Sequence, residues 1–126
     1  MKPFRYPWLW FLPGLAWAIT LCYASLTPVP ESTPLPSDKL LHFTAYFILL
    51  FLFGSWVSNK RLPLVVVLGA VMGMGLEYLQ GLTDYRSFEW ADGLANLTGA
   101  VAGAGLAATP LGRFFLMIER QIVRQG

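Results

Sequence analysis

Four apolar stretches of about twenty residues each, separated by short loops, constrain this chain more than any other feature. They lie at residues 8–26, 38–57, 62–80 and 91–109. A helix needs roughly 20 residues to cross the hydrocarbon of a bilayer, and a spanning helix satisfies all its backbone polar groups internally. The sequence therefore predicts an all-α, polytopic membrane protein in which four transmembrane helices form a bundle.

The composition agrees with this class of protein. The 126 residues are 56% hydrophobic with a mean hydropathy of +0.54, and 13% are charged, against roughly 25% in soluble domains. The net charge of +2 is too small to indicate nucleic acid as a partner, so membrane lipids are the expected partners. We expect one transmembrane domain over residues 1–126. The single cysteine, Cys22, allows no disulfide within the chain.

Basic residues are distributed unevenly between the two sides of a four-span bundle. Seven of them fall on the side that holds both termini: Lys2, Arg5, Lys60, Arg61, Arg113, Arg120 and Arg124. The opposite side carries Lys39 and Arg86. Because short cytoplasmic loops are enriched in lysine and arginine, we expect both termini in the cytoplasm. In a bacterium, this orientation puts the loops that carry Lys39 and Arg86 on the outer face of the membrane.

The two ends of the chain have patterns of their own. The first apolar stretch is longer than the usual 7–15 residues of a signal-peptide core, so we expect it to be retained as a span. Pro13 lies in its first turns and predicts a kink or a late helix start. Residues 110–126 alternate apolar side chains with arginines, which is typical of an amphipathic helix along the membrane surface.

Small residues recur at four-residue spacing in the third and fourth stretches, as Gly69 and Gly73 and as Gly99 and Gly103. Such stripes let helix backbones approach closely in lipid. They predict tight packing within the chain, and a homodimer through the same faces is the alternative.

Polar side chains gather near the expected outer ends of three spans. They are Asp38, His42, Tyr46, Glu77, Gln80, Arg86, Asp92 and Asn96. Spacings of three or four residues put the members from each span on one helix face. The predicted topology puts the three faces at a common depth, with Arg86 in the loop between the last two spans. We therefore expect a polar pocket on the outer face of the bundle.

Glu77 is the member that most needs an explanation. It lies near a helix C-terminus, where negative charge is disfavoured, so it requires a cation, a proton or a ligand. An ion pair with Arg86 is the structural explanation. Asp38 and Asp92, by contrast, could simply stabilise the N-termini of their helices.

The same residues suit the headgroup of an amphiphile. We assign His42, Glu77 and Asp92 as candidate catalytic residues, because histidine exchanges protons near neutral pH and a carboxylate can act as a base or orient the ring. A guanidinium binds phosphate in a bidentate manner, which makes Arg86 a candidate ligand of a lipid phosphate. The other candidate substrate-binding residues are Asp38, Tyr46, Gln80 and Asn96.

Other chemistries stay open. No serine or cysteine nucleophile is placed beside the polar residues, so the sequence does not decide whether the protein is an enzyme. His42, Glu77, Asp92 and Asp38 are suitable ligand types for a divalent metal, but no local histidine spacing supports one, and we predict no metal or cofactor. A structural or partner-binding protein, with the polar residues in an interhelical hydrogen-bond network, is the alternative.

The order and spacing of these motifs resemble the VanZ-like family of small bacterial membrane proteins. The motifs are Asp38-Lys39-Leu40-Leu41-His42-Phe43-x-x-Tyr46, Glu77-x-x-Gln80, Arg86 and Asp92-x-x-x-Asn96-x-x-Gly99. The resemblance covers residues 38–105 and implies a multi-span inner-membrane protein. The family's namesake is associated with low-level resistance to teicoplanin, a glycopeptide that targets lipid-linked cell-wall precursors. The resemblance therefore implies a lipid-linked precursor as a candidate partner and a link to glycopeptide susceptibility.

Overall fold

The computed structural model describes residues 1–28, 38–85 and 87–126. The described part of the chain is helical and contains no strand, which confirms the all-α prediction. The five helices are α1 (Pro7–Leu26), α2 (Asp38–Trp56), α3 (Leu62–Gly81), α4 (Trp90–Ala108) and α5 (Phe114–Gln125). Short 3-10 turns, η1 (Asn59–Arg61) and η2 (Pro110–Arg113), precede α3 and α5. The first four helices match the four predicted spans to within one residue at each end.

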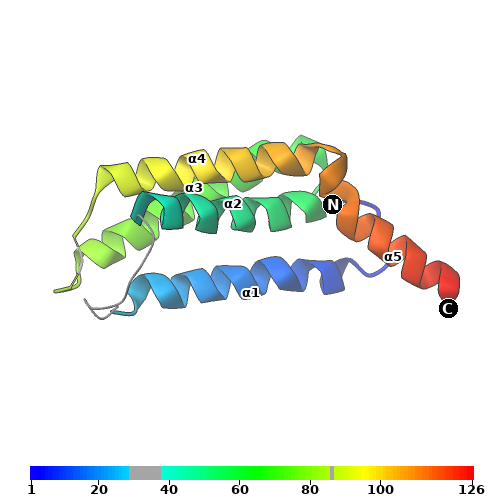
Figure 1. Cartoon of the computed structure of the whole chain (residues 1–126), viewed down its shortest axis with the longest axis horizontal. Helices are drawn as coiled ribbons and strands as arrows, with labels where there is room; N and C mark the ends of the chain where they lie inside the picture. Colours follow the sequence, from blue (N-terminus) through cyan, green and yellow to red (C-terminus); the bar gives the residue numbers. More distant parts are fainter. Residues whose placement is uncertain (29–37, 86) are drawn as a thin grey trace.

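Helices α1 to α4 lie lengthwise beside one another, and both chain termini lie at the same end of this bundle (Figure 1). We call this the termini end, and the opposite end, where α2 and α4 begin and α3 finishes, the loop end. Helix α5 leaves the termini end at an angle of 72° to α4. The bundle and the C-terminal helix are thus as predicted.

Three segments are each long and apolar enough to cross a membrane: α1, α2 and the stretch Asn59–Gly81 that contains α3. Helix α4 passes the same test only together with α5, so the part of the chain that the structure describes has three or four candidate spans. Large apolar side chains such as Trp8, Ile19 and Val71 lie on the outside, whereas Glu77 is only 1% exposed. This arrangement, with apolar residues on the outside and polar residues on the inside, is expected of a protein surrounded by lipid.

The most extensive helix contact joins α2 and α4, which run in the same direction. Their backbones approach so closely that a Cβ at Gly99 would collide with the carbonyl oxygen of Phe43, and one at Gly103 with that of Phe47. Glycine is therefore required at both positions. The small-residue stripe of α4 packs against α2 within the chain, and a homodimer remains a prediction.

Helix α1 packs less extensively, mainly against α2. It begins at Pro7 and continues through Pro13, so the predicted late start is wrong. Trp17 Nε1 donates to the carbonyl oxygen of Ala45 at 2.9 Å and joins α1 to α2. Between α1, α2 and α3 lies an apolar cavity of about 430 Å³, whose lining includes Phe53 and Leu68.

The termini end is held together by two buried charged side chains. Lys2 Nζ donates to the carbonyl oxygens of Gly54 and Val57, at 2.7 and 2.8 Å, where α2 ends. Burial lowers the pKa of the Lys2 ammonium, and the Arg113 guanidinium lowers it further. A cation is favourable at this position because the helix dipole places negative charge there.

Glu119 of α5 is the second of these side chains. Its Oε2 accepts from the backbone N–H of Arg5 at 2.8 Å, and its Oε1 accepts from the backbone N–H of Tyr6 and from Trp10 Nε1, both at 2.9 Å. Desolvation of the carboxyl raises its pKa, but these N–H donors outweigh that effect and hold the pKa of Glu119 below its ordinary value. The carboxylate therefore anchors α5 to the start of α1.

Candidate functional site

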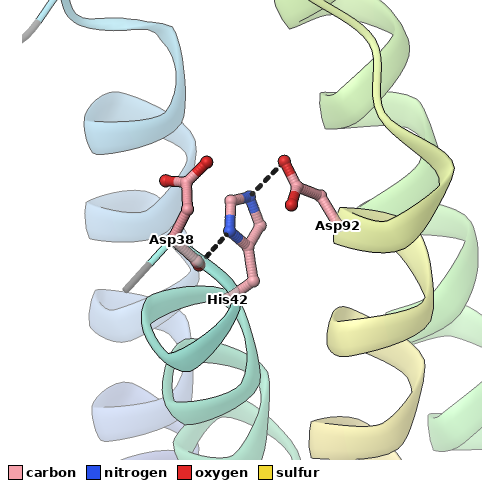
Figure 2. Close-up of side chains that lie close together, drawn as sticks. All are labelled: Asp38, His42 and Asp92. Atoms are coloured by element: carbon pink, nitrogen blue, oxygen red, sulfur yellow. Dashed lines mark hydrogen bonds and ion pairs between the residues drawn. The ribbon is translucent and has the colours of Figure 1, made fainter. Parts of the chain in front are cut away.

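Four of the predicted site residues come together at the loop end, from three helices. Asp38 and His42 lie in the first turns of α2, Asp92 in the first turn of α4 and Glu77 in the last turns of α3. Figure 2 shows the His42 ring between the Asp38 and Asp92 carboxylates. We call these four residues the His42 cluster.

The orientation of the His42 ring follows from its backbone contact. Its Nδ1 lies 2.7 Å from the carbonyl oxygen of Asp38, and because a carbonyl can only accept, Nδ1 must carry the proton (Figure 2). The other nitrogen, Nε2, faces two carboxylates. It lies 3.8 Å from Glu77 Oε2 and 3.9 Å from Asp92 Oδ2, both longer than a hydrogen bond.

Glu77 is the most deeply buried member, with a side chain that is 1% exposed. Its Oε1 accepts a hydrogen bond of 3.0 Å from the backbone N–H of Glu89, in the segment before α4. One carboxylate oxygen is therefore held by backbone, and the other is directed to His42. The predicted structural partner, Arg86, lies outside the described residues.

Lys39 is a functional candidate that the sequence analysis treated only as a loop charge. Its Nζ lies 2.6 Å from Asp92 Oδ1 and 2.8 Å from Glu89 Oε2, and its side chain is 45% exposed. This pair of ionic contacts links the start of α2 to the start of α4. The sequence feature that could have identified Lys39 is its position directly after Asp38, at the same helix end as the acidic residues.

The other predicted residues lie around the cluster. Tyr46 and Asn96 are buried one turn deeper, and both lie close to Gly73 of α3, where an added Cβ would be 3.2 Å from each side chain. Asn96 Oδ1 is buried without a hydrogen-bond partner among the described residues. Gln80 is directed elsewhere, since its Nε2 donates to the carbonyl oxygen of Ser25 in α1 at 2.8 Å.

The cluster is chemically a set of proton acceptors and cation ligands. Ligand atoms of Asp38, His42 and Asp92 all lie within 4.8 Å of one another. Among the described residues, Lys39 is the positively charged side chain beside these ligand atoms, and it pairs with both Asp92 and Glu89. Within the described residues, the arrangement is therefore suited to binding a proton or a cation, or to accepting a proton from a bound molecule.

The fold and the site together define a helical membrane protein with a buried imidazole–carboxylate cluster at one end of its bundle. The chain belongs to the VanZ/LLP1 family, which it matches over residues 8–116. The resemblance seen in the sequence motifs is thereby confirmed.

The chain is also similar to an uncharacterized protein, C11E3.10, of the fission yeast Schizosaccharomyces pombe. The two are 36% identical over an alignment of 84 positions that covers 63% of this chain and 48% of the yeast protein. The chain thus matches about half the length of this curated relative. No solved structure matches the chain.

Proposed function

We propose that this protein binds or modifies a cell-envelope lipid, such as a lipid-linked cell-wall precursor, whose headgroup lies at the His42 cluster. The observation that carries the proposal is the convergence of Glu77 and Asp92 on His42 Nε2, within 3.9 Å, at one end of an otherwise apolar bundle. Ionisable groups inside a membrane bundle are costly and mark functional sites.

The depth of the cluster supports a lipid headgroup as the ligand. Asp38 and Asp92 lie in the first turns of their helices, the part of a span nearest to the membrane surface. Trp90 and Tyr85 are exposed at the same end, at 71% and 48%. Tryptophan and tyrosine concentrate at the level of lipid headgroups.

The proposed orientation places the cluster on the outer face of a bacterial inner membrane. The termini end carries Lys2, Lys60 and Arg61 as well as the arginines of α5. With this basic end in the cytoplasm, both termini are cytoplasmic and the loop end faces outward. The outward face is where a lipid-linked cell-wall precursor would be met.

The residues have distinct proposed roles. His42, Glu77 and Asp92 act on the headgroup by accepting or donating protons. Asp38 and Lys39 lie at the exposed rim. Tyr46 and Asn96 form the deeper wall, and Gln80 forms the side toward α1, where its amide donates to Ser25. Arg86 binds phosphate through its guanidinium.

A structural role is the second candidate, and the contacts of Lys39 and Glu77 favour it. Lys39 joins α2 to α4, and Glu77 holds the backbone before α4. Interhelical hydrogen bonds in membrane proteins contribute about 0.6 kcal/mol on average, so such a network would stabilise the bundle modestly. The structural role predicts that Glu77→Gln lowers the stability of the bundle. The lipid site predicts that Glu77→Gln weakens ligand binding and leaves stability unchanged.

Native mass spectrometry of the full chain in mild detergent separates the two. Wild type is compared with Glu77→Gln and Arg86→Ala, and with Asp84→Asn as the control for an exposed carboxylate at the same end. We expect wild type and Asp84→Asn to retain a phosphate-bearing lipid that the other two variants lose, with unchanged melting temperatures. A lower melting temperature of Glu77→Gln in step with any lipid loss, or the same lipids in all four proteins, would contradict the proposal.

We also propose that the site affects glycopeptide susceptibility. Deletion in the source organism should then change the inhibitory concentration of teicoplanin, and the Glu77→Gln variant should fail to restore it. Complementation by Asp84→Asn serves as the control.

A further inference from the structure

The His42 cluster is strongly acidic for a site that receives an anionic headgroup. Asp38, Glu77 and Asp92 contribute three carboxylates, and Glu89 lies close by. Among the lysines and arginines that the structure describes, Lys39 is the one that forms ion pairs with these carboxylates. An anion entering this space would meet net negative charge unless another cation were present.

We propose that the His42 cluster binds one divalent metal ion, with His42 Nε2 and the carboxylates of Asp38 and Asp92 as its ligands. This inference deepens the proposed function and rests on it for the role of the metal. It departs from the sequence-based expectation of no metal, because two of the ligands come from α2 and the third from α4.

The distances suit such an ion after small side-chain movements. Metal–ligand bonds of about 2.1 Å at tetrahedral angles put ligand atoms roughly 3.4 Å apart. Nε2 and Asp92 Oδ2 are 3.9 Å apart, so they need to approach by about half an ångström. Asp38 supplies the third ligand from an exposed side chain, which is free to rotate toward the ion.

The contacts behind these ligands are those that metal sites require. A metal-binding imidazole almost always donates its other N–H to a carbonyl or carboxylate, and here Nδ1 donates to the Asp38 carbonyl oxygen. Ligating carboxylates are themselves held by partners, and Lys39 holds Asp92 Oδ1 while leaving Oδ2 directed to the ring. The ring and the carboxylate are thus oriented before any ion arrives.

A second observation is independent of the acidic residues. The Asn96 side-chain oxygen is buried, one helical turn from Asp92 on the same face of α4, without a hydrogen-bond partner among the described residues. A buried acceptor without a donor is costly. A water molecule bound to the ion could donate to it.

The ligand types narrow the choice of ion. Imidazole is suited to zinc and other transition metals, and carboxylates are suited to magnesium, calcium and manganese. One imidazole with two carboxylates therefore favours Zn²⁺ or Mn²⁺. The bound ion would attract phosphate oxygens of the headgroup. Because His42, Asp38 and Asp92 would then be ligands of the ion, proton transfer within the cluster would fall to Glu77.

The test is isothermal titration calorimetry of the EDTA-treated full chain in detergent, with Zn²⁺ and Mn²⁺ as probes. Removing a supporting partner of a metal ligand typically costs 10–100-fold in affinity, so removal of a ligand should cost at least as much. We expect His42→Ala and Asp92→Asn to weaken binding of the better probe by about 100-fold. The control Asp84→Asn should bind as wild type does.

A change of ligand keeps the proposal testable if these variants fold poorly. A thiolate is a softer ligand than imidazole, so His42→Cys should retain Zn²⁺ and gain affinity for Cd²⁺ relative to wild type. Circular dichroism and gel filtration check that each protein is folded. A wild-type protein that binds neither probe would overturn the metal site. So would wild-type affinity for Zn²⁺ and Mn²⁺ in Asp92→Asn together with no gain of Cd²⁺ affinity in His42→Cys.

Metal and lipid are separable in the same preparations. If wild type retains a phosphate-bearing lipid but the EDTA-treated protein binds neither Zn²⁺ nor Mn²⁺, the proposed function stands and the metal site does not. If Zn²⁺ or Mn²⁺ binds as expected and no lipid is retained, the metal site stands and the lipid function fails.

Discussion

Replacing Glu119 by glutamine should loosen the termini end of the bundle. The carboxylate receives three N–H donors, of which Arg5 and Tyr6 contribute backbone groups just before α1. A hydrogen bond to a charged group contributes about 1.5–3 kcal/mol. In Glu119→Gln one oxygen can keep the contacts of Oε1, whereas the amide NH₂ cannot accept from Arg5. We therefore expect a loss of about 2 kcal/mol, or roughly 30-fold in the unfolding equilibrium.

The loss can be measured by unfolding the protein reversibly in mixed micelles with increasing SDS. The pKa of Glu119 is lower in the folded protein, so its carboxylate contributes stability that is present above the ordinary pKa of 4.5. That contribution is lost as the pH falls through the lowered pKa. The difference between wild type and Glu119→Gln should thus be constant near neutral pH and shrink well below pH 4.5. Equal stabilities at pH 7 would refute the reasoning.

Three further predictions concern packing, the N-terminal contact and topology. Gly99→Leu should destabilise the bundle by at least about 3 kcal/mol because the added side chain meets the α2 backbone, whereas Gly105→Ala, where the space is open, should be neutral in the same SDS titration. Lys2→Met should cost about 1–2 kcal/mol because the last carbonyls of α2 lose their donor, and an unchanged unfolding midpoint would contradict this. In a cysteine-free background, Arg124→Cys should be labelled by a membrane-impermeant maleimide only after cell lysis and Asp84→Cys in intact cells. The reverse pattern would invert the proposed orientation.

The helices were predictable from the sequence because apolar length is a local property. The ends of α2 and α4 agree with the predicted spans to within one residue, and the common level of His42, Glu77 and Asp92 followed from helix spacing and parity. The small-residue stripe containing Gly99 was likewise recognised before its partner was known.

The partners of individual side chains could not be predicted, because they depend on tertiary contacts. No sequence pattern singled out Glu119, because only the turn after α4 brings it to residues more than 100 positions away. Lys39 joins Asp92 because α2 and α4 begin at the same end. Gln80 shares a face with Glu77, yet its amide reaches α1.

Photocrosslinking tests most directly whether the His42 cluster receives a lipid headgroup. A benzophenone amino acid is placed in living cells at Leu41, beside His42, and as a control at Leu68, far from the cluster on α3. The proposal predicts a defined phosphate-bearing lipid attached at position 41 that disappears in Glu77→Gln, while bulk lipids attach at position 68 in both backgrounds. The same mixture of bulk lipids at both positions, unchanged by Glu77→Gln, would contradict it.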